Sequence, residues 1–444
     1  MKSMEKYIAP VLALAIFATR GSAADTNALE TLTLEQAHAL ALKNHPEVAA
    51  ADYRALAAAE VVKESRAAYL PQANLVGTAA GADSRETRIE AGGLNNPSVF
   101  NRVAGGLTAS QLLTDFGHTV NLIASSRLQA QAEMQNANAT REQVLLNVDV
   151  SYFGTLQAQA LVTVARQTVD TRQNLFNQVS LMASNKLKSE LDVNFASVQL
   201  SQGKLLLQSA SNEFNASLAS LSTALGYREF HPFKLVEEAP QVMGNTNDIS
   251  SLIDTALRYR PEIQALQDSR DAAVRFARAQ RDARLPTVSA VGAAGGSPAH
   301  DERLPDNYAA GGLQLSLPLF AGGLYVARQH EAELRADADS ELLRSLEDNV
   351  IRDVRIAWLN LNTARERLQT SEQLVNEAQQ AFQLAQAQYS VGTSSIVELS
   401  QGQLALTSAQ IEETSARYDV LTEEANLNFQ IGGLSAGTPN TVSK

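Results

Sequence analysis

The sequence predicts a mixed fold in which long coiled-coil helices join short strands that form part of a membrane β-barrel. Three observations predict this fold. The second half of the chain repeats the pattern of the first, a predicted helix of about 66 residues has a heptad pattern from Val350 onward, and four short segments alternate apolar and polar residues. Each half therefore supplies long helices and a two-strand hairpin, and the chain consists of two tandem repeats.

The chain begins with the features of a secretory signal peptide. Lys2 and Lys6 precede an apolar run over 7–18, and small residues around Ala23 offer a cleavage site, so we expect 1–23 to be removed on export. The apolar run is shorter than the about 20 residues of a membrane helix. Because the sequence has no cysteine, it predicts no disulfide, no thiolate metal site and no lipoprotein anchor.

Composition narrows the class of protein further. The formal charge of −12 argues against nucleic acid as a partner. Aromatic residues make up only 5% of the chain, while alanine, glutamine and asparagine are abundant. Such a composition suits long helices that pack through small side chains better than a thick globular core.

The duplication is visible as a constant offset between matching residues. Pro71 and Pro286, each preceded by leucine, are 215 positions apart, whereas Asp192 and Glu398 are 206 apart. One length difference, in the loop between the two strands of each half, accounts for the change. A register kept over about 200 residues indicates two structural repeats.

The expected elements follow the same order in both halves. The first repeat covers 24–226 and the second 248–433, with a linker or small side domain over 227–247 and a tail over 434–444. In each repeat a short helix precedes a helix that starts at a proline, which is favoured at a first helical position. The remaining expected elements are strands at about 72–84, 104–114, 287–296 and 310–320, long helices at about 118–183 and 324–389, and return helices at 189–226 and 395–432.

The second long helix has the clearest periodicity. From Val350 onward, apolar or small residues recur at alternating intervals of four and three, through Phe382 to Tyr389, which is a heptad seam. At 1.5 Å per residue this helix is roughly 100 Å long. The first long helix repeats the seam more weakly.

The alternating segments predict strands with one lipid-facing side. In the last segment every second residue is leucine, and the first half has a weaker counterpart; the expected lipid-facing residues are Leu107, Leu313, Leu315, Leu317 and Leu319. Aromatic residues at both ends suggest two girdles. Phe100 and Tyr308 lie towards the loop tips, and Phe116, Phe320 and Tyr325 lie at the opposite end. A pair of soluble hairpins packed on a helix is the alternative.

Four strands cannot close a barrel by themselves. Closed barrels need eight or more strands, and an open edge is not tolerated in lipid. An exported chain with four such strands therefore implies an oligomer. Two chains would supply eight strands and three would supply twelve, and the strand count allows either.

Taken together, the duplicated layout, the segment LSLPLFAGG before the second long helix and YSVGTSSIVEL at its end resemble the outer-membrane factor family, the TolC-like efflux ducts. The resemblance implies a homotrimer with a twelve-stranded barrel in the outer membrane and a twelve-helix tube that crosses the periplasm. It also implies a passive channel opened at its periplasmic tip by a periplasmic adaptor protein and an inner-membrane transporter, in efflux or type I secretion.

Two turns at the far ends of the long helices carry the expected functional residues. Ser189 with Asp192, and Ser395 with Glu398, fit capping boxes, which alone could explain both acids. The resemblance implies in addition that Asp192, Glu398 and Tyr389 line or latch a periplasmic gate, where three copies of each acid would attract cations.

The gate departs from the family at two positions, because relatives can have arginine at Ser394 and a second acid at Gln401. The turns themselves are candidates for adaptor contact, although their residues are also ordinary turn formers. The candidate contact residues are Asn185, Leu187, Gly392 and Thr393.

Nothing in the sequence indicates an enzyme, a cofactor or a metal site. The six histidines are scattered, and no catalytic or phosphate-binding motif occurs. The alternative from another class is a periplasmic helical-hairpin scaffold, which would share the coiled coil and the export signal without forming a channel. The cargo is not specified by the sequence.

Overall fold

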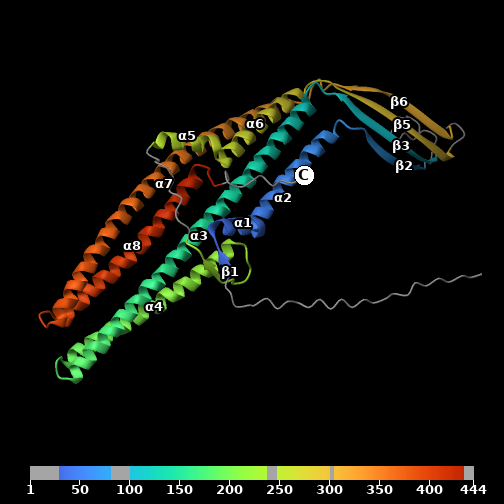
Figure 1. Cartoon of the computed structure of the whole chain (residues 1–444). Coiled ribbons are helices and arrows are strands. Elements are labelled where there is room, and N and C mark those ends of the chain that lie inside the picture. Colours follow the sequence, from blue (N-terminus) through green and yellow to red (C-terminus); the bar gives the residue numbers. More distant parts are fainter. Residues whose placement is uncertain (1–29, 82–100, 238–247, 301–304, 435–444) are drawn as a thin grey trace, which may run out of the picture.

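The computed structural model describes residues 30–81, 101–237, 248–300 and 305–434. The molecule is elongated (Figure 1). Long helices run side by side along its length, a four-stranded sheet extends from one end, and two helical hairpins reach the other end. None of the described helices has an apolar stretch of the length needed to cross a bilayer.

The two halves contain the same succession of helices and strands. The first half has α1 (Leu34–Asn44), α2 (Pro46–Ala67), β2 (Gln72–Ala80), β3 (Arg102–Thr114), α3 (His118–Ser184) and α4 (Glu190–Ala224). The second half has α5 (Ile249–Tyr259), α6 (Pro261–Asp282), β5 (Thr287–His300), β6 (Asn307–Ser316), α7 (Leu324–Ser390) and α8 (Ile396–Gln430). Corresponding helices have equal lengths of 11, 22, 67 and 35 residues.

Local sequence explains where the helices begin. Thr33 and Gln36 form a capping box at the start of α1. Pro46 and Pro261 occupy the first turns of α2 and α6, where the missing N–H has no cost. Gly117 and Gly323, at φ of +117° and +84°, precede α3 and α7 and turn the chain from strand into helix.

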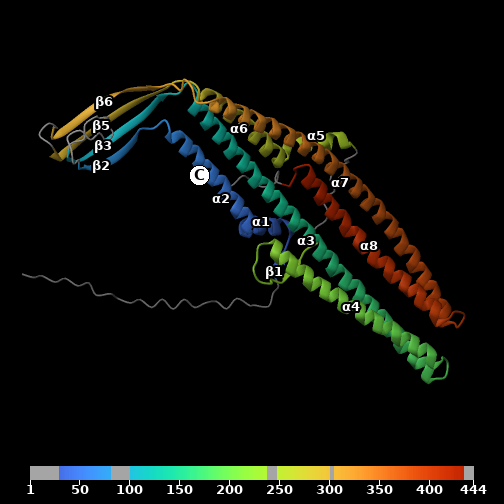
Figure 2. The same cartoon turned by 180° about the vertical axis from the view of Figure 1, so that it is seen from behind.

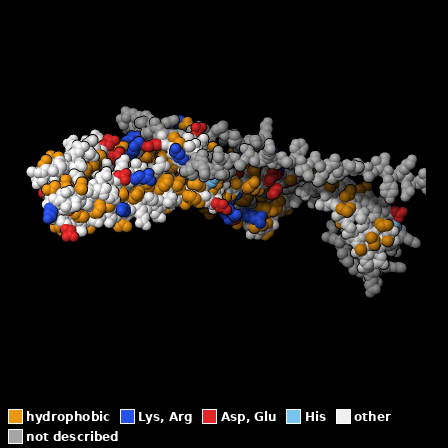
Figure 3. All heavy atoms as spheres, turned by 60° about the horizontal axis from the view of Figure 1, so that its bottom comes forward, with side chains coloured by type: hydrophobic (Ala, Val, Ile, Leu, Met, Phe, Trp, Pro, Cys, Tyr) orange, Lys and Arg blue, Asp and Glu red, His pale blue; other side chains and the backbone are white. Residues whose placement is uncertain are grey.

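The heptad seam of α7 lies in the interior of the helical layer. Val350, Val354 and Leu361 are buried together with Leu427 of α8 in one apolar cluster near the middle of the molecule. A second cluster surrounds Tyr152 of α3. The long helices are thus held by apolar packing along their seams, and most of their outward side chains remain exposed (Figure 3).

The sheet is antiparallel, in the order β2-β3-β5-β6, so the two hairpins lie side by side. Its register places Leu75, Leu107, Leu313 and Leu315 on one face, since side chains alternate along each strand. These four side chains are between 59% and 82% exposed. We call this the leucine face. Leu75 was not among the residues expected there.

The structure corrects two of the expected lipid-facing residues. Leu317 and Leu319 lie after the end of β6, in the connection to α7. The reason is Pro318, which has no N–H to donate to a neighbouring strand. The expected strand over 310–320 is accordingly shifted towards the loop.

The register also corrects the expected place of Tyr308. It is opposite Gly295 and on the same face as Gln314, so it is not on the leucine face. Its hydroxyl lies over Gly106 and Gly295, where any side chain would collide with it. Phe116, Phe320 and Tyr325 lie in and just after the turns that lead into α3 and α7. Phe100 falls outside the described residues.

The segment between the halves contributes one strand of a small parallel sheet that the sequence did not reveal. β1 (Glu30–Leu32) pairs with β4 (Phe233–Leu235). The hydroxyl of Tyr152 lies 2.9 Å from the carbonyl oxygen of Leu32 and 2.7 Å from that of Val236. The sheet is thereby attached to the middle of α3.

The same segment is attached to α8 by a charged contact. The Tyr418 hydroxyl donates to Glu237 at 3.3 Å, and Arg417 pairs with Glu237 at 2.8 Å. Burial, followed by the charge of Glu237, raises the pKa of Tyr418 to about 12. Because this pKa is above the ordinary value of 10, the folded protein holds the phenol proton more tightly than the unfolded chain.

We expect Tyr418 to make the protein lose stability as the pH rises from 10 to about 12. The Tyr418→Phe variant, which has no ionisable hydroxyl, should show a shallower loss over that range. Thermal unfolding of both proteins from pH 8 to 12 checks this. Parallel curves for the two proteins would contradict the assigned contact.

Candidate functional site at the hairpin tips

The α3–α4 turn is closed by backbone hydrogen bonds at the end of α3. The N–H of Lys186 donates to Ala183 and that of Leu187 donates to Met182, each at 2.9 Å, which is the Schellman arrangement. Lys186 therefore occupies the left-handed position, with φ of +61°. Asn185, the residue before it, keeps φ of −88°, and its side-chain amide donates to the carbonyl of Leu181.

The α7–α8 turn repeats this geometry with glycine in the left-handed position. The N–H of Gly392 donates to Tyr389 at 3.2 Å and that of Thr393 donates to Gln388 at 3.0 Å. Gly392 has φ of +81°. Gly392 and Lys186 are 206 positions apart and so correspond in the two repeats. The left-handed position of the turn is therefore glycine in the second repeat and lysine in the first.

The two acids cap the helices that follow, but they do so differently. Asp192 forms a complete capping box, in which its carboxylate accepts from the N–H of Ser189 at 3.0 Å. The N–H of Glu398 donates to the Ser395 hydroxyl at 3.2 Å, without the reciprocal bond. The Glu398 carboxylate accepts instead from the Ser394 hydroxyl. The second capping box is thus only half formed.

Tyr389 brings the two hairpins together at their tips. It is only 3% exposed, and its hydroxyl has no hydrogen-bond partner among the described residues. The ammonium of Lys188, from the other hairpin, lies 4.1 Å from the centre of its ring. Burial, with a smaller effect from the charge of Asp192, raises the pKa of Tyr389, so the ring remains neutral at physiological pH.

An apolar cluster surrounds this tyrosine and joins all four long helices. Val179 of α3 and Ala196 of α4 pack in it with Phe382 of α7 and Leu399 of α8. The two tips lie near each other in both views (Figures 1 and 2). A displacement of the α7–α8 hairpin relative to α3 and α4 would therefore have to separate this cluster.

Beside the cluster, the interface between the hairpins is partly polar and incompletely bonded. A pocket of about 160 Å³ between α3, α7 and α8 is lined by amide side chains, by Thr171 and by the apolar side chains of Leu175, Phe382 and Leu399. Among the described residues, the buried side-chain polar atoms without a partner all lie in this part of the molecule: Arg172, Ser180, Tyr389, Ser400 and Gln403. Each such group costs roughly 1–3 kcal/mol, so this interface is held less firmly than the middle of the molecule.

The residues expected to contact an adaptor occupy the exposed ends of the turns. Leu187 is 73% exposed, and Val391, which the sequence analysis did not select, is 74% exposed. Asn185 and Thr393 use their side chains to bond the preceding helix turns, and Gly392 has open space around it. The sequence did not indicate a role for Lys188 either. Only its contact with Tyr389 of the other hairpin distinguishes it from an ordinary lysine in a turn.

Comparison with known proteins assigns the chain to a family. A family profile described as "Outer membrane efflux protein" matches residues 38–227 and 252–433. These two segments cover most of the chain and coincide with the two sets of matching helices and strands. The chain belongs to the outer membrane efflux protein family.

Relatives of this outer membrane efflux protein match between 74% and 95% of its length. The outer membrane protein TolC of Vibrio cholerae is 26% identical over 437 residues, which cover 95% of each chain. The alkaline protease secretion protein AprF of Pseudomonas aeruginosa is 24% identical, covering 91% of this chain and 85% of AprF. A toluene efflux pump outer membrane protein, TtgI of Pseudomonas putida, is 23% identical over 334 residues, which cover 74% of this chain and 70% of TtgI.

Solved structures have the same fold. The Campylobacter jejuni CmeC outer membrane channel superposes with a TM-score of 0.78 at 18% identity, covering 90% of this efflux protein and 85% of CmeC. CusC superposes with a TM-score of 0.77 at 19% identity, covering 90% and 92%. The arrangement of long helices and strands is therefore that of these channels.

We predict opposite effects for two substitutions of Tyr389. Tyr389→Phe removes an unpartnered buried hydroxyl and should leave the tip equally stable or more stable by about 1 kcal/mol. Tyr389→Ala leaves a cavity between the hairpins and should cost roughly 3–5 kcal/mol. Hydrogen exchange of tip amides measures both. Equal weakening by the two variants would mean that the hydroxyl has a partner.

We also predict opposite effects for glycine exchanges at the two left-handed positions. Lys186→Gly should stabilise its turn by about 1 kcal/mol and Gly392→Ala should destabilise its turn by about the same amount. Exchange protection of the Leu187 and Thr393 amides reports each turn. Asn185→Gly, at negative φ, is the control and should lose protection; a gain there would contradict the assigned turn geometry.

Proposed function

We propose that this chain is the outer-membrane exit duct of a tripartite efflux or type I secretion system, and that it works as a homotrimer. The relatives include proteins named for efflux and for protease secretion, which supports both kinds of cargo. The main support for the proposal is that, within the described residues of one chain, the sheet has two unpaired edge strands and the helical layer has two end helices without a further neighbour.

The helical layer is open because its contacts stop at α2 and α7. α2 packs on α3, α3 on α6, and α6 on α7. In the repeated pattern, α7 corresponds to α3 and α2 corresponds to α6, so the contact of α3 with α6 predicts a contact of α7 with α2. These two helices are at opposite ends of the order α2, α3, α6, α7. The contact would therefore form between α7 of one copy and α2 of a second copy. Exposed apolar residues on both helices, such as Leu56 and Leu334, suit this second contact.

The junctions between strand and helix differ in the same way. At Gly117, before α3, an added side chain would come within 3.0 Å of Asp282 of α6. At the corresponding Gly323, before α7, nothing lies within 4 Å. The place that Asp282 occupies beside α3 is therefore empty beside α7, and α2 of a second copy would fill it.

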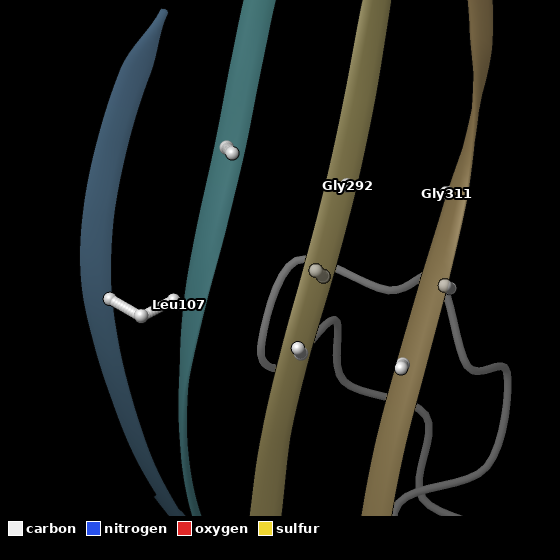
Figure 4. A pocket seen from close by; sticks show the side chains of 8 residues that line it. Leu107, Gly292 and Gly311 are labelled. Carbon is white, nitrogen blue, oxygen red and sulfur yellow. The ribbon is translucent and has the colours of Figure 1, made fainter.

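The sheet supports the same conclusion for the membrane end. β2 and β6 are its edge strands, and exposed edges in lipid would leave backbone groups without hydrogen bonds. Three copies would pair these edges into a twelve-stranded barrel with the leucine face towards lipid. Small residues of β5 and β6 line a shallow hollow in this face (Figure 4). Phe116, Phe320 and Tyr325 would form the girdle on the helix side.

The hairpin tips would form the gate of the duct. Lys188 and Tyr389 hold the α7–α8 hairpin to its neighbour, and the two acids lie at the starts of the return helices, Asp192 in α4 and Glu398 in α8. A periplasmic adaptor binding at the exposed turns, together with an inner-membrane transporter, would separate the hairpins. The buried polar groups without partners beside the tip cluster lower the cost of this movement.

The proposal includes export by the signal peptide over 1–23 and residence in the outer membrane without a lipid anchor. The periplasmic scaffold is the second candidate, because long helical hairpins alone would serve it. Flotation separates the two: a duct reconstituted into phospholipid vesicles floats with them, whereas a scaffold stays in the soluble fraction.

Conductance in planar bilayers tests the duct and its gate. We expect discrete cation-preferring channels that conduct more in the Tyr389→Ala variant. Asp192→Asn with Glu398→Gln keeps acceptors for the helix caps and removes the charges, so the preference for K⁺ over Cl⁻ should fall towards unity. Glu190→Gln, an exposed acid in the same turn, is the control. No channels from any variant would refute the duct, and unchanged selectivity would refute the gate assignment.

A further inference from the structure

A charged groove between α6 and α7 has no role in the proposed duct. Its volume is about 230 Å³, and it is lined by Arg278 and Arg281 of α6, by Glu333 and Asp337 of α7, and by Val274, Ala277 and Ala336. The groove thus offers two guanidinium groups and two carboxylates around an apolar floor. Such a set suits a ligand that carries a positive and a negative charge a few ångströms apart.

The charges of this groove do not satisfy one another. Arg281 pairs with the adjacent Asp282 at 3.1 Å, and Glu333 accepts from Gln329 at 2.7 Å and lies 3.7 Å from His330. Neither Arg278 nor Asp337 has a hydrogen-bond or ion-pair partner among the described residues. One cation and one anion therefore line the same groove unpaired.

The groove lies just below the sheet. Arg281 is one residue before the end of α6, and β5 starts six residues after it. Above it, Leu285, Leu319 and Phe320 expose apolar side chains at the junction. A phospholipid whose acyl chains contact the leucine face would hold its headgroup at about this height.

Backbone chirality indicates the side on which the groove opens. Ser297 follows Gly295 by two positions on the face opposite the leucines, and its N–H donates to Asp306 on the β6 side. In a strand of L-residues, the face of a side chain fixes the side to which its N–H points, so this bond fixes the order of the strands. Viewed from the loop ends, with the leucine face outward, the strands follow one another clockwise from β2 to β6. The helices follow one another in the same order. Because α6 is right-handed, Arg278 then lies on the outward side of the helical layer, the side of the leucine face.

We propose that this groove binds the headgroup of a zwitterionic phospholipid with a primary ammonium, in the leaflet on the helix side of the membrane. The phosphate contacts Arg278 and Arg281, and the ammonium donates to Glu333 and Asp337. The proposal rests on the proposed membrane location of the sheet. A quaternary ammonium has no N–H to donate, so the groove distinguishes phosphatidylethanolamine from phosphatidylcholine.

The test uses the full mature protein in vesicles of equal parts phosphatidylethanolamine and phosphatidylcholine, followed by native mass spectrometry of the lipids that it retains. We expect the ethanolamine lipid to be retained preferentially. Arg278→Gln with Asp337→Asn should reduce that preference about tenfold, the effect of about 1.4 kcal/mol. The control Arg270→Gln with Asp271→Asn removes a cation and an anion from α6 two turns further from the sheet, and should retain the preference.

Equal retention of the two lipids by the unmodified protein would overturn the proposal, as would equal loss in the groove variant and the control. Flotation of each protein with the vesicles is measured in parallel. Protein that does not float refutes the membrane location itself, whereas protein that floats without lipid preference refutes only the headgroup site. The oligomeric state of each variant in detergent shows whether it remains folded.

Discussion

The fold depends on one constraint, which is that backbone hydrogen-bonding groups cannot be left unpaired in a membrane. A four-stranded sheet has two edges, and β2 and β6 are those edges here. The two edges do not pair with each other within one chain, because each repeat supplies only one hairpin and four strands do not close a barrel. The helices are incomplete in a similar way. α6 packs between two long helices, α3 and α7, whereas α2, its counterpart in the first repeat, packs on only one long helix, α3. In the proposed duct, the same additional copies would complete both the strands and the helices.

The long helices are held with unequal strength along their length. In the middle, Tyr152, Leu361 and Tyr418 lie in buried apolar clusters that also fix the small sheet of β1 and β4. Towards the tip, the apolar cluster around Tyr389 lies beside buried polar groups without partners. These unpartnered groups lower the cost of moving the α7–α8 hairpin, and the apolar cluster opposes that movement.

The sequence predicted the long helices because a heptad repeat sustained over many turns leaves little ambiguity. It predicted the strands less well, because Pro318 ends β6 and alternating leucines continue past it. The face of Tyr308 depends on the register between β5 and β6, which no local pattern contains. The contact between Lys188 and Tyr389 joins residues about 200 positions apart and becomes visible only in the folded chain. The strands β1 and β4, at three residues each, are too short to leave a periodic signal.

The central claim, that the chain closes only with copies of itself, is tested most directly by a disulfide between α2 and α7. The Ser125 hydroxyl of α3 donates to the carbonyl of Ala272 in α6 at 2.8 Å. The corresponding residues are Glu331 in α7 and Ala57 in α2 of the next copy. The sequence has no cysteine, so Ala57→Cys with Glu331→Cys introduces the only thiols. The account predicts that oxidation yields covalent trimers and no larger species. Monomers alone, or an open ladder beyond three chains, would contradict it.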